Sequence, residues 1–400
     1  MRRKMLSIAL LAMLALGCSA KASAKDIAID ETNFPDPGLR EYVQTAYDTN
    51  RDGVLSDEEN KAAKEMNVYF NADPNLMISI REDYYYDYYN LGKWEVHKEF
   101  PCDQIAENPL RPHYEAYVVG SYPWKCVINQ PVKSWKGLEN LTSLGWMDIG
   151  GAVPENLEIK GVRTLYGLTI GGDTSDFVSV SVKKCPKFRY LTFARTYKLK
   201  KIVLSKDLKD LREIEQREFF DSSVSGQDTR RKKPEIVIGE AARLKEINIW
   251  QKPIKNLRVD YSSLKRLSRM TLLMDNSKED MDLSSCKELY SLTVLGKCHK
   301  IILPNKKLFA EKSDGDDNWR YDPDILVSFG PKDGPKILDL SKSTRAGNYA
   351  DEYIFPELMR KLKKGKVRTK TLIVSRKMYD NRWNTMRLLR KKGIKIQIKG

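Results

Sequence analysis

The chain has 400 residues, more than one ordinary hydrophobic core holds, so we expect several domains or a repeat array. Hydrophobic residues make up 41% of the chain and aromatic residues 10%, which excludes wholesale disorder. The formal net charge is +16, but residues 360–400 hold sixteen Lys and Arg residues against one acid, and residues 25–359 are close to neutral. This uneven distribution excludes a uniformly basic nucleic-acid-binding protein, and nucleic acid is not an expected partner.

The first 24 residues have the pattern of a signal peptide. A basic start at residues 2–4 precedes an apolar stretch over residues 5–17, and the small residues at 22–24 fit the site that signal peptidase cuts. The apolar stretch is too short for a permanent membrane span, so we expect a secreted, extracellular protein without a transmembrane span. The alternative is a lipoprotein anchored through Cys18, because residues 15–18 resemble a lipobox.

Five cysteines follow the predicted cleavage site. Cys102 and Cys126 lie in one irregular segment and could form a disulfide in an oxidising compartment. Cys185, Cys286 and Cys298 fall on apolar positions of the pattern described below, where we expect small buried hydrophobic residues. The sequence holds no CxxC pair, so a zinc site is not expected.

Residues 48–59 predict a calcium loop. Calcium prefers six to eight oxygen ligands, and a twelve-residue loop can wrap them around the ion. The oxygens would come from loop positions one, three, five, seven, nine and twelve, which are Asp48, Asn50, Asp52, the backbone carbonyl of Val54, Ser56 and Glu59. Gly53 permits the sharp turn, and Ser56 with Glu59 forms a capping box for a helix expected to continue to Met66. The alternative is an acidic turn that caps a helix without metal.

An apolar pattern recurs about every 23 residues between residues 138 and 303. Its form is apolar-x-x-apolar-x-x-apolar-x-apolar, and the first copy is Leu138, Leu141, Leu144 and Trp146. A second series of short apolar pairs, such as Leu157 and Ile159, keeps the same spacing. Both series lengthen at the same place, which one insertion at residues 219–233 explains. In a repeat protein each turn buries its apolar edge against the neighbouring turns. A spacing of about 23 residues is the leucine-rich-repeat period.

Residues 29–36, the loop at 48–59 and the repeat together resemble a family of secreted bacterial leucine-rich-repeat proteins. The Cys-x-x-Leu-x-x-Leu-x-Val form at residues 286–294 is similar to the cysteine-containing repeats of bacterial surface proteins. The resemblance implies extracellular binding or adhesion and assigns no common catalytic activity. Residues 70–134 depart from the family's pattern.

The expected fold class is α+β, with a leucine-rich-repeat solenoid of 22–23-residue repeats, an N-terminal EF-hand module and terminal caps. In chain order, the expected parts are a signal peptide at 1–24, a calcium module at 25–70, an aromatic-rich cap at 71–134, the solenoid at 135–345 and a basic cap at 346–400. The aromatic-rich part, which includes Tyr84–Tyr89, either covers the end of the solenoid or forms a binding surface. The basic residues within 360–400 form either a solvated surface or a contact for an anionic cell-wall polymer or lipid headgroups.

The expected function is binding of an extracellular protein or glycan, with calcium as the cofactor. The candidate surface residues lie between the apolar positions of the repeat and are Tyr166, Arg189, Thr192, Arg212, Lys245, Asn248, Trp250 and Tyr290. The alternatives are a secreted hydrolase with its site in residues 70–134 and a structural cell-surface protein. The sequence has no GxSxG or HExxH motif and only three histidines, so an enzyme is not expected.

Overall fold

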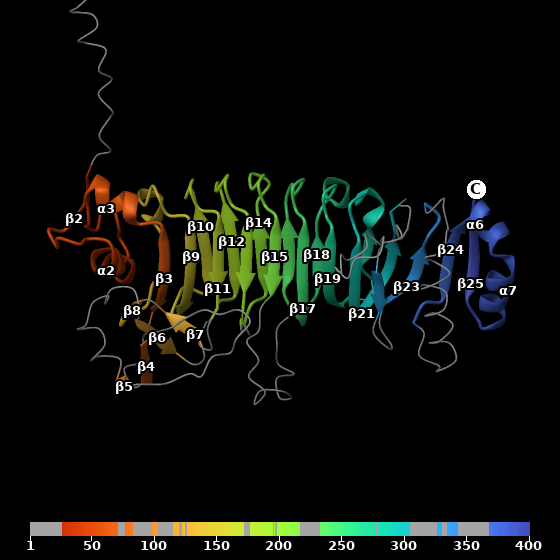
Figure 1. Cartoon of the computed structure of the whole chain (residues 1–400), viewed down its shortest axis with the longest axis horizontal. Helices are drawn as coiled ribbons and strands as arrows, with labels where there is room; N and C mark the ends of the chain where they lie inside the picture. The colour runs from red at the N-terminus through yellow and green to blue at the C-terminus, as the bar shows by residue number, and fades with distance from the viewer. Residues whose placement is uncertain are drawn as a thin grey trace, which may run out of the picture.

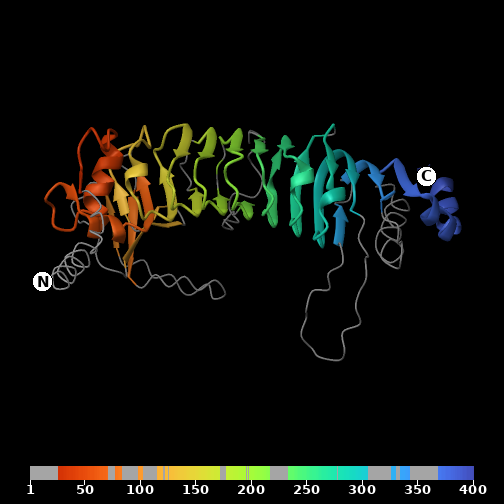
Figure 2. The ribbon, with the colours of Figure 1, turned by 90° about the horizontal axis from the view of Figure 1, so that it is seen from above.

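The computed structural model describes residues 26–70, 77–82, 98–101, 115–119, 122–124, 126–171, 177–194, 196, 198–216, 233–276, 278–304, 326–329, 334–342 and 368–400. The molecule is an elongated stack of short strands, with helices α2 and α3 at one end and helices α6 and α7 at the other (Figure 1). A second view, turned by 90°, shows the same elongated stack (Figure 2). The predicted signal peptide, Cys18, Cys102 and Tyr84–Tyr89 lie outside the described residues.

The main sheet has 14 strands and runs the length of the molecule (Figure 1). Its hydrogen-bonded neighbours follow the order β8 (Cys126–Ile128), β3 (Glu65–Phe70), β9 (Trp146–Gly151), β11 (Gly167–Ile170), β13 (Tyr190–Phe193), β15 (Glu213–Gln216), β17 (Glu246–Ile254), β19 (Arg269–Asp275), β21 (Ser291–Ile302), β23 (Gly334–Asp339), β24 (Thr371–Ser375) and β25 (Lys395–Lys399). Beside this path, β21 also pairs with β20 (Asp280–Asp282) and β22 (Leu326–Phe329). Neighbouring strands in this sheet are parallel.

A second parallel sheet has five strands, in the order β10 (Asn156–Lys160), β12 (Ser179–Lys183), β14 (Lys201–Leu204), β16 (Glu235–Ile238) and β18 (Asn256–Arg258). From β9 to β19 the chain alternates between the two sheets. Two small antiparallel sheets consist of β1 (Ile27–Ala28) with β2 (Val54–Leu55), and of β5 (Lys98–Pro101), β4 (Met77–Glu82), β6 (Glu115–Val119) and β7 (Tyr122–Trp124). The described helices are α2 (Pro37–Ala46), α3 (Asp57–Ala62), α6 (Arg376–Asn381) and α7 (Trp383–Lys391), with short 3-10 turns at Leu138–Asn140, Tyr261–Ser263 and Leu283–Ser285.

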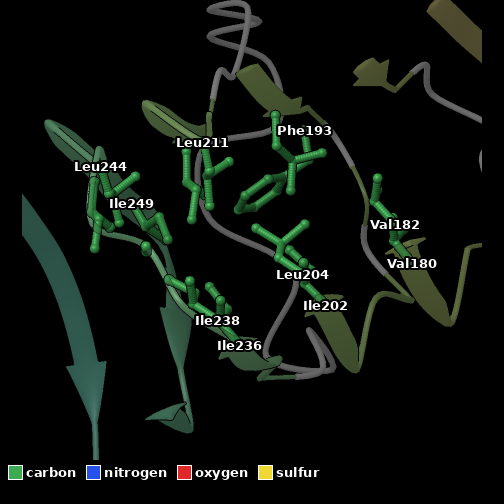
Figure 3. Packing of buried hydrophobic residues seen from close by; sticks show 14 of the residues in the cluster. Val180, Val182, Phe193, Ile202, Leu204, Leu211, Ile236, Ile238, Leu244 and Ile249 are labelled. Carbon is green, nitrogen blue, oxygen red and sulfur yellow. The ribbon is translucent and has the colours of Figure 1, made fainter. Parts of the chain in front are cut away.

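In the middle of the molecule the hydrophobic core lies between the two parallel sheets (Figure 3), and at its ends the core includes residues of α2 and α7. Side chains alternate between the two faces of a strand, so the alternating apolar residues of each strand point into the core. Leu168 of β11 is the register partner of Leu191 of β13, and Val180 of β12 is the partner of Ile202 of β14. All four are fully buried. Each such side chain contributes about 1.5 to 3 kcal/mol through removal of its apolar surface from water.

The core includes Cys126, Cys185, Cys286 and Cys298, which are free thiols in the described part of the chain. Burial raises the pKa of Cys185 to about 11 and the pKa values of the other three to about 12. These thiols therefore remain protonated at neutral pH, where a buried cysteine packs as a small hydrophobic residue.

The prediction of an α+β leucine-rich-repeat solenoid with an EF-hand module is wrong. The described residues form mostly parallel strands, in sheets of 14 and five, with few helices, which is an α/β-like arrangement. Both apolar series of the sequence form short strands that pair in parallel with the next turn, so each turn supplies two sheets and leaves few residues for helices.

The helix expected after the calcium loop is also shorter than predicted. Helix α3 ends at Ala62, and Met66 lies in strand β3 of the main sheet. Residues 65–70 alternate in burial over their first four positions and include Val68, Tyr69 and Phe70, whose branched and aromatic side chains favour strands. The segment after the loop therefore belongs to the sheet and cannot serve as the second helix of an EF-hand.

Candidate functional site

The acidic loop, which we define as residues 48–59, connects α2 to α3. It contains β2, which pairs with β1 of the same chain, so that Ala28 lies opposite Val54 and Ile27 opposite Leu55. Two such loops commonly pair through strands of this kind, and here residues 27–28 provide the partner strand. The side chain of Leu55 is fully buried and fixes the loop against the core.

The oxygens at the first half of the acidic loop turn inward onto backbone amides. Asp48 accepts hydrogen bonds from the Asp52 N–H through Oδ1 (3.2 Å) and from the Gly53 N–H through Oδ2 (3.0 Å). Asn50 Oδ1 accepts from the same Asp52 N–H at 3.0 Å, and Asp52 Oδ1 accepts from the Val54 N–H at 2.8 Å. Asp48 is only 3% exposed. The side-chain oxygens of Asp48 and Asn50 therefore lie around one N–H group inside the loop.

The turn of the acidic loop depends on Gly53, whose φ is +78°. No atom lies within 4 Å of the position that a Cβ would take there, so space does not restrict this residue. The left-handed backbone conformation restricts this position to glycine, because L-residues with a side chain rarely adopt it.

Glu59 closes the acidic loop. Its Oε1 accepts hydrogen bonds from the N–H and Oγ1 of Thr49, both at 2.7 Å. Its Oε2 accepts from the N–H (3.0 Å) and Oγ (2.8 Å) of Ser56, which is the N-cap of α3. Burial opposes the charged form, but the hydrogen bonds from Ser56 and Thr49 outweigh it and lower the pKa of Glu59 to about 2. One carboxylate thus joins the start of the loop to its end.

The donor set of the acidic loop fits calcium in its chemistry. Three carboxylates, an amide oxygen, a hydroxyl and the Val54 carbonyl supply the hard oxygens that calcium prefers. The carboxylates do not converge, however, since no three His, Cys, Asp or Glu side chains form a metal-binding group in the part of the chain that the structure describes. Glu59 would have to exchange hydrogen bonds with Thr49 and Ser56 for contact with an ion.

The low pKa of Glu59 gives a first testable prediction. A carboxyl group whose pKa is near 2 in the folded protein and 4.5 ordinarily stabilises the fold in its charged form. This contribution is complete above about pH 4.5 and is lost as the pH falls from 4.5 to 2. In calcium-free buffer we expect Glu59→Gln to reduce the fall in melting temperature over this range, measured by circular dichroism. Glu58→Gln is the matched control, because Glu58 is exposed on the same helix, and equal slopes in both variants would contradict the assignment.

The acidic loop is tied to the main stack through Asn60 of α3. The Asn60 Nδ2 group donates to the Asn140 carbonyl at 2.9 Å, and Asn60 Oδ1 accepts from the Thr142 N–H at 2.9 Å. Asn60 is buried, and it is next to Glu59 in the chain. Asn60 therefore links the end of the acidic loop to residues 140–142.

A second candidate site is the edge row, which we define as the residues that immediately precede seven main-sheet strands. Its members are Gly145, Tyr166, Arg189, Arg212, Lys245, Ser268 and Tyr290. From Tyr166 onward, the backbone N–H of each member donates to the carbonyl of the preceding member at 2.7 to 2.8 Å. Five of the eight predicted surface residues belong to this row.

The other three predicted surface residues lie within strands. Thr192 of β13 and Asn248 of β17 each pair in register with Glu215 of β15, so all three are on one face of the main sheet. Thr192 is only 7% exposed and offers little surface, whereas Asn248 is half-buried. Trp250 has its backbone in β17, and its side chain lies outside the described part of the structure.

The charges along the edge row differ in their pairing. Arg189 forms an ion pair with Asp210, at 3.7 Å. Arg212 and Lys245 have no ion-pair partner among the residues that the structure describes. Lys245 is exposed and Arg212 is half-buried. The middle of the edge row therefore carries positive charge that no carboxylate of the described residues pairs with.

Sequence reasoning missed an aromatic cluster at the N-terminal part of the edge row, which consists of Trp146, Tyr166 and Tyr190. The apolar pattern predicted that Trp146 is a core residue, but its side chain is half-buried on the outer face of the sheet. Its register partners on the neighbouring strands are Gly167 and Glu65. Met147 and Ile149 are the buried residues of β9. The spacing from Leu144 to Met147 and Ile149 also fits the apolar pattern, and this alternative alignment could have identified Trp146 as an outward residue.

Comparisons with protein-family models, with curated proteins and with solved structures found no match to this chain. Within the described residues, no helix is long and apolar enough to cross a membrane. The acidic loop, the edge row and the aromatic cluster are therefore the features of the molecule that bear on its function.

Proposed function

We propose that this chain is an extracellular calcium-binding protein that binds a protein or glycan through the edge row and the adjoining outer face of the main sheet. The observation that supports the proposal is the unbroken row from Gly145 to Tyr290, in which hydrogen-bonded backbone holds consecutive side chains in register. Neighbouring strands lie about 4.8 Å apart, so the row presents side chains at a fixed spacing. Such an array suits an extended or flat partner.

The acidic loop supplies the calcium site in this proposal. Extracellular calcium reaches the millimolar range at which even weak sites, with dissociation constants of about 10⁻⁴ to 10⁻³ M, are filled. The ion would be held by the oxygens of Asp48, Asn50, Asp52 and Glu59. Its role would be to fix the loop and, through Asn60, the end of the sheet stack.

Charge reversal at the edge row tests the binding surface. The variant Arg212→Glu/Lys245→Glu changes the two cations that lack ion-pair partners within the described residues. Its matched control is Lys160→Glu/Lys201→Glu, because both lysines are exposed on the five-stranded sheet. On an array of extracellular proteins and glycans, we expect the first variant to lose binding by about tenfold or more, equivalent to about 1.4 kcal/mol. Equal binding by both variants would reject the edge row as the binding surface.

A second candidate function belongs to the C-terminal helix α7. Trp383 and Leu388 are 49% and 44% exposed, which is unusual for large hydrophobic residues, and Arg387 and Lys391 are exposed on the same helix. Residues 368–400 contain eleven Lys and Arg residues and one acid. These features favour contact with an anionic cell-wall polymer, because positive charge attracts the polymer and the exposed apolar groups add contact area.

Salt dependence tests this second candidate. Exposed charges are screened as ionic strength rises, so binding to a poly(glycerol phosphate) polymer should weaken steeply with added salt. We expect Arg387→Gln/Lys391→Gln/Lys392→Gln to weaken binding at low salt, measured by calorimetry. The control replaces Lys160, Lys183 and Lys201 with Gln on the five-stranded sheet. Unchanged binding by the helix variant would leave the basic residues as a solvated surface.

A further inference from the structure

Three aromatic rings meet at the N-terminal part of the edge row. The ring centroids of Trp146 and Tyr166 are 5.7 Å apart, and those of Trp146 and Tyr190 are 6.4 Å apart. The plane of the Trp146 ring is tilted by 53° to that of Tyr166 and by 41° to that of Tyr190, so Trp146 contacts both tyrosine rings. Tyr166 is 40% exposed, and Trp146 and Tyr190 are half-buried. We call these three rings the aromatic platform.

Two glycines provide the floor of the aromatic platform. A Cβ placed on Gly167 would lie 2.1 Å from Cε3 and Cζ3 of Trp146, and one placed on Gly145 would lie 2.5 Å from Cε1 of Tyr166. The indole of Trp146 therefore lies across the β11 backbone, and the Tyr166 ring lies against Gly145. The two glycines therefore leave the space that the Trp146 and Tyr166 rings occupy next to the backbone.

Polar groups border the aromatic platform. Glu65 is the exposed register partner of Trp146, and Asp148 follows two residues later on the same face. Asn67, on the neighbouring strand, donates to Asp148 Oδ2 at 3.4 Å. Arg189 directly precedes Tyr190 in the chain, and its side chain is 39% exposed. Carboxylate and amide oxygens accept hydrogen bonds from hydroxyl groups, and the guanidinium donates to them.

We infer that the aromatic platform binds a neutral glycan, with sugar rings stacked on Trp146, Tyr166 and Tyr190 and hydroxyl groups bonded to Glu65, Asp148 and Arg189. This inference rests on the proposed function, for which it names the ligand class. The apolar faces of sugar rings match flat aromatic rings, and their hydroxyls match the polar border. An anionic ligand is disfavoured because Glu65 and Asp148 lie beside the rings.

Two other ligand classes fit the aromatic platform less well. A cation bound by aromatic rings needs ring faces directed at it from several sides, but here the Trp146 and Tyr166 rings lie against Gly167 and Gly145. A peptide that adds a strand needs a free sheet edge, but β9 and β11 both lie between two neighbouring strands. The observations therefore favour a neutral glycan.

Affinity electrophoresis and a glycan array test the inference. The probes are neutral hexasaccharides of glucose, mannose, galactose and xylose, with a lysine-rich peptide as the cationic probe. We expect the full chain to bind at least one hexasaccharide, and Trp146→Ala and Tyr166→Ala each to weaken that binding by about tenfold or more. Lys201→Ala is the control, because it removes an exposed side chain from strand β14 of the five-stranded sheet, to which no binding role is assigned. Melting curves of each variant establish that it is folded.

The outcomes separate this inference from the proposed function. Failure to bind any neutral hexasaccharide, or glycan binding that survives both Trp146→Ala and Tyr166→Ala, would overturn the inference. Binding of the lysine-rich peptide alone would overturn it in favour of a cationic ligand. Binding to another extracellular partner that is lost in Arg212→Glu/Lys245→Glu and kept in Trp146→Ala would reject the platform and leave the proposed function in place. Loss of glycan binding in the platform variants alone would support the inference.

Discussion

About 10 mM calcium is expected to raise the unfolding free energy by about 1.4 to 2.7 kcal/mol. This range follows from a dissociation constant of about 10⁻³ to 10⁻⁴ M and from binding to the folded state alone. The energy comes from contact of the ion with the oxygens of Asp48, Asp52 and Glu59, offset by the hydrogen bonds from Thr49 and Ser56 that Glu59 gives up. Calorimetry and thermal melting with and without calcium measure the effect.

The choice of variants for this test follows from the hydrogen bonds of the acidic loop. Asp48 accepts from two backbone amides, so Asp48→Ala would destabilise the loop even without metal. Asp48→Asn keeps an acceptor oxygen and removes the charge, and Glu59→Gln does the same at the other end of the loop. Both should abolish the calcium-induced shift, whereas Glu58→Gln should keep it. The absence of a binding heat, with equal melting shifts in all four proteins, would mean that residues 48–59 form only an acidic turn.

The calcium effect should extend from the acidic loop into the main sheet. The loop leads through α3 into β3, which pairs with β9, and Asn60 joins α3 to residues 140–142. We therefore expect calcium to slow amide hydrogen exchange in α3 and β3 and to leave β19 and β21 unchanged, because those strands are remote from the loop (Figure 1). Equal protection along the whole stack would contradict this local coupling.

Several buried positions of the core could be read from the sequence, but the fold class could not. Leu168, Leu191 and Val180 are buried where the apolar pattern places them, because apolar burial determines the pattern directly. The pattern does not specify what lies between the apolar positions. Leucine-rich repeats and stacks of two parallel sheets both bury one apolar edge per turn, so a spacing of about 23 residues does not distinguish them.

The loop and the sheet surface differ in what the sequence can reveal. The oxygens of Asp48 and Asn50 turn inward because side chains two apart in a short turn reach the same backbone amide, here the Asp52 N–H. The aromatic platform, by contrast, joins Trp146 of β9, Tyr166 immediately before β11 and Tyr190 of β13, which are 20 and 24 residues apart in the chain. The strand register determines which of these side chains meet, and the apolar pattern does not specify that register. Aligning the first copy of the pattern three residues too early placed Trp146 in the core.

A second large effect is expected in the energetic coupling between Gly167 and Trp146, because the Trp146 ring lies over this glycine. The register partners of Gly167 are Trp146 and Tyr190, and Tyr190 in turn pairs with Glu213, so the backbone at this position accepts large side chains. The three heavy atoms nearest to the site of a Cβ at Gly167 all belong to the Trp146 ring, two of them at 2.1 Å. Gly167→Ala should therefore cost about 1 to 3 kcal/mol in the native protein, since the ring must move.

The same substitution should have the opposite sign once the ring is absent. In a Trp146→Ala background, Gly167→Ala should stabilise the protein by about 0.5 to 1 kcal/mol, the usual gain when alanine replaces glycine within a strand. Urea unfolding of the wild type, both single variants and the double variant gives the coupling energy, which we expect to be about 2 kcal/mol or more. Tyr290→Ala in place of Trp146→Ala is the control and should be additive with Gly167→Ala, because Tyr290 lies at the far end of the edge row. Additivity of Gly167→Ala with Trp146→Ala as well would mean that the indole does not lie over Gly167 in solution, and the aromatic platform would then have no preformed floor.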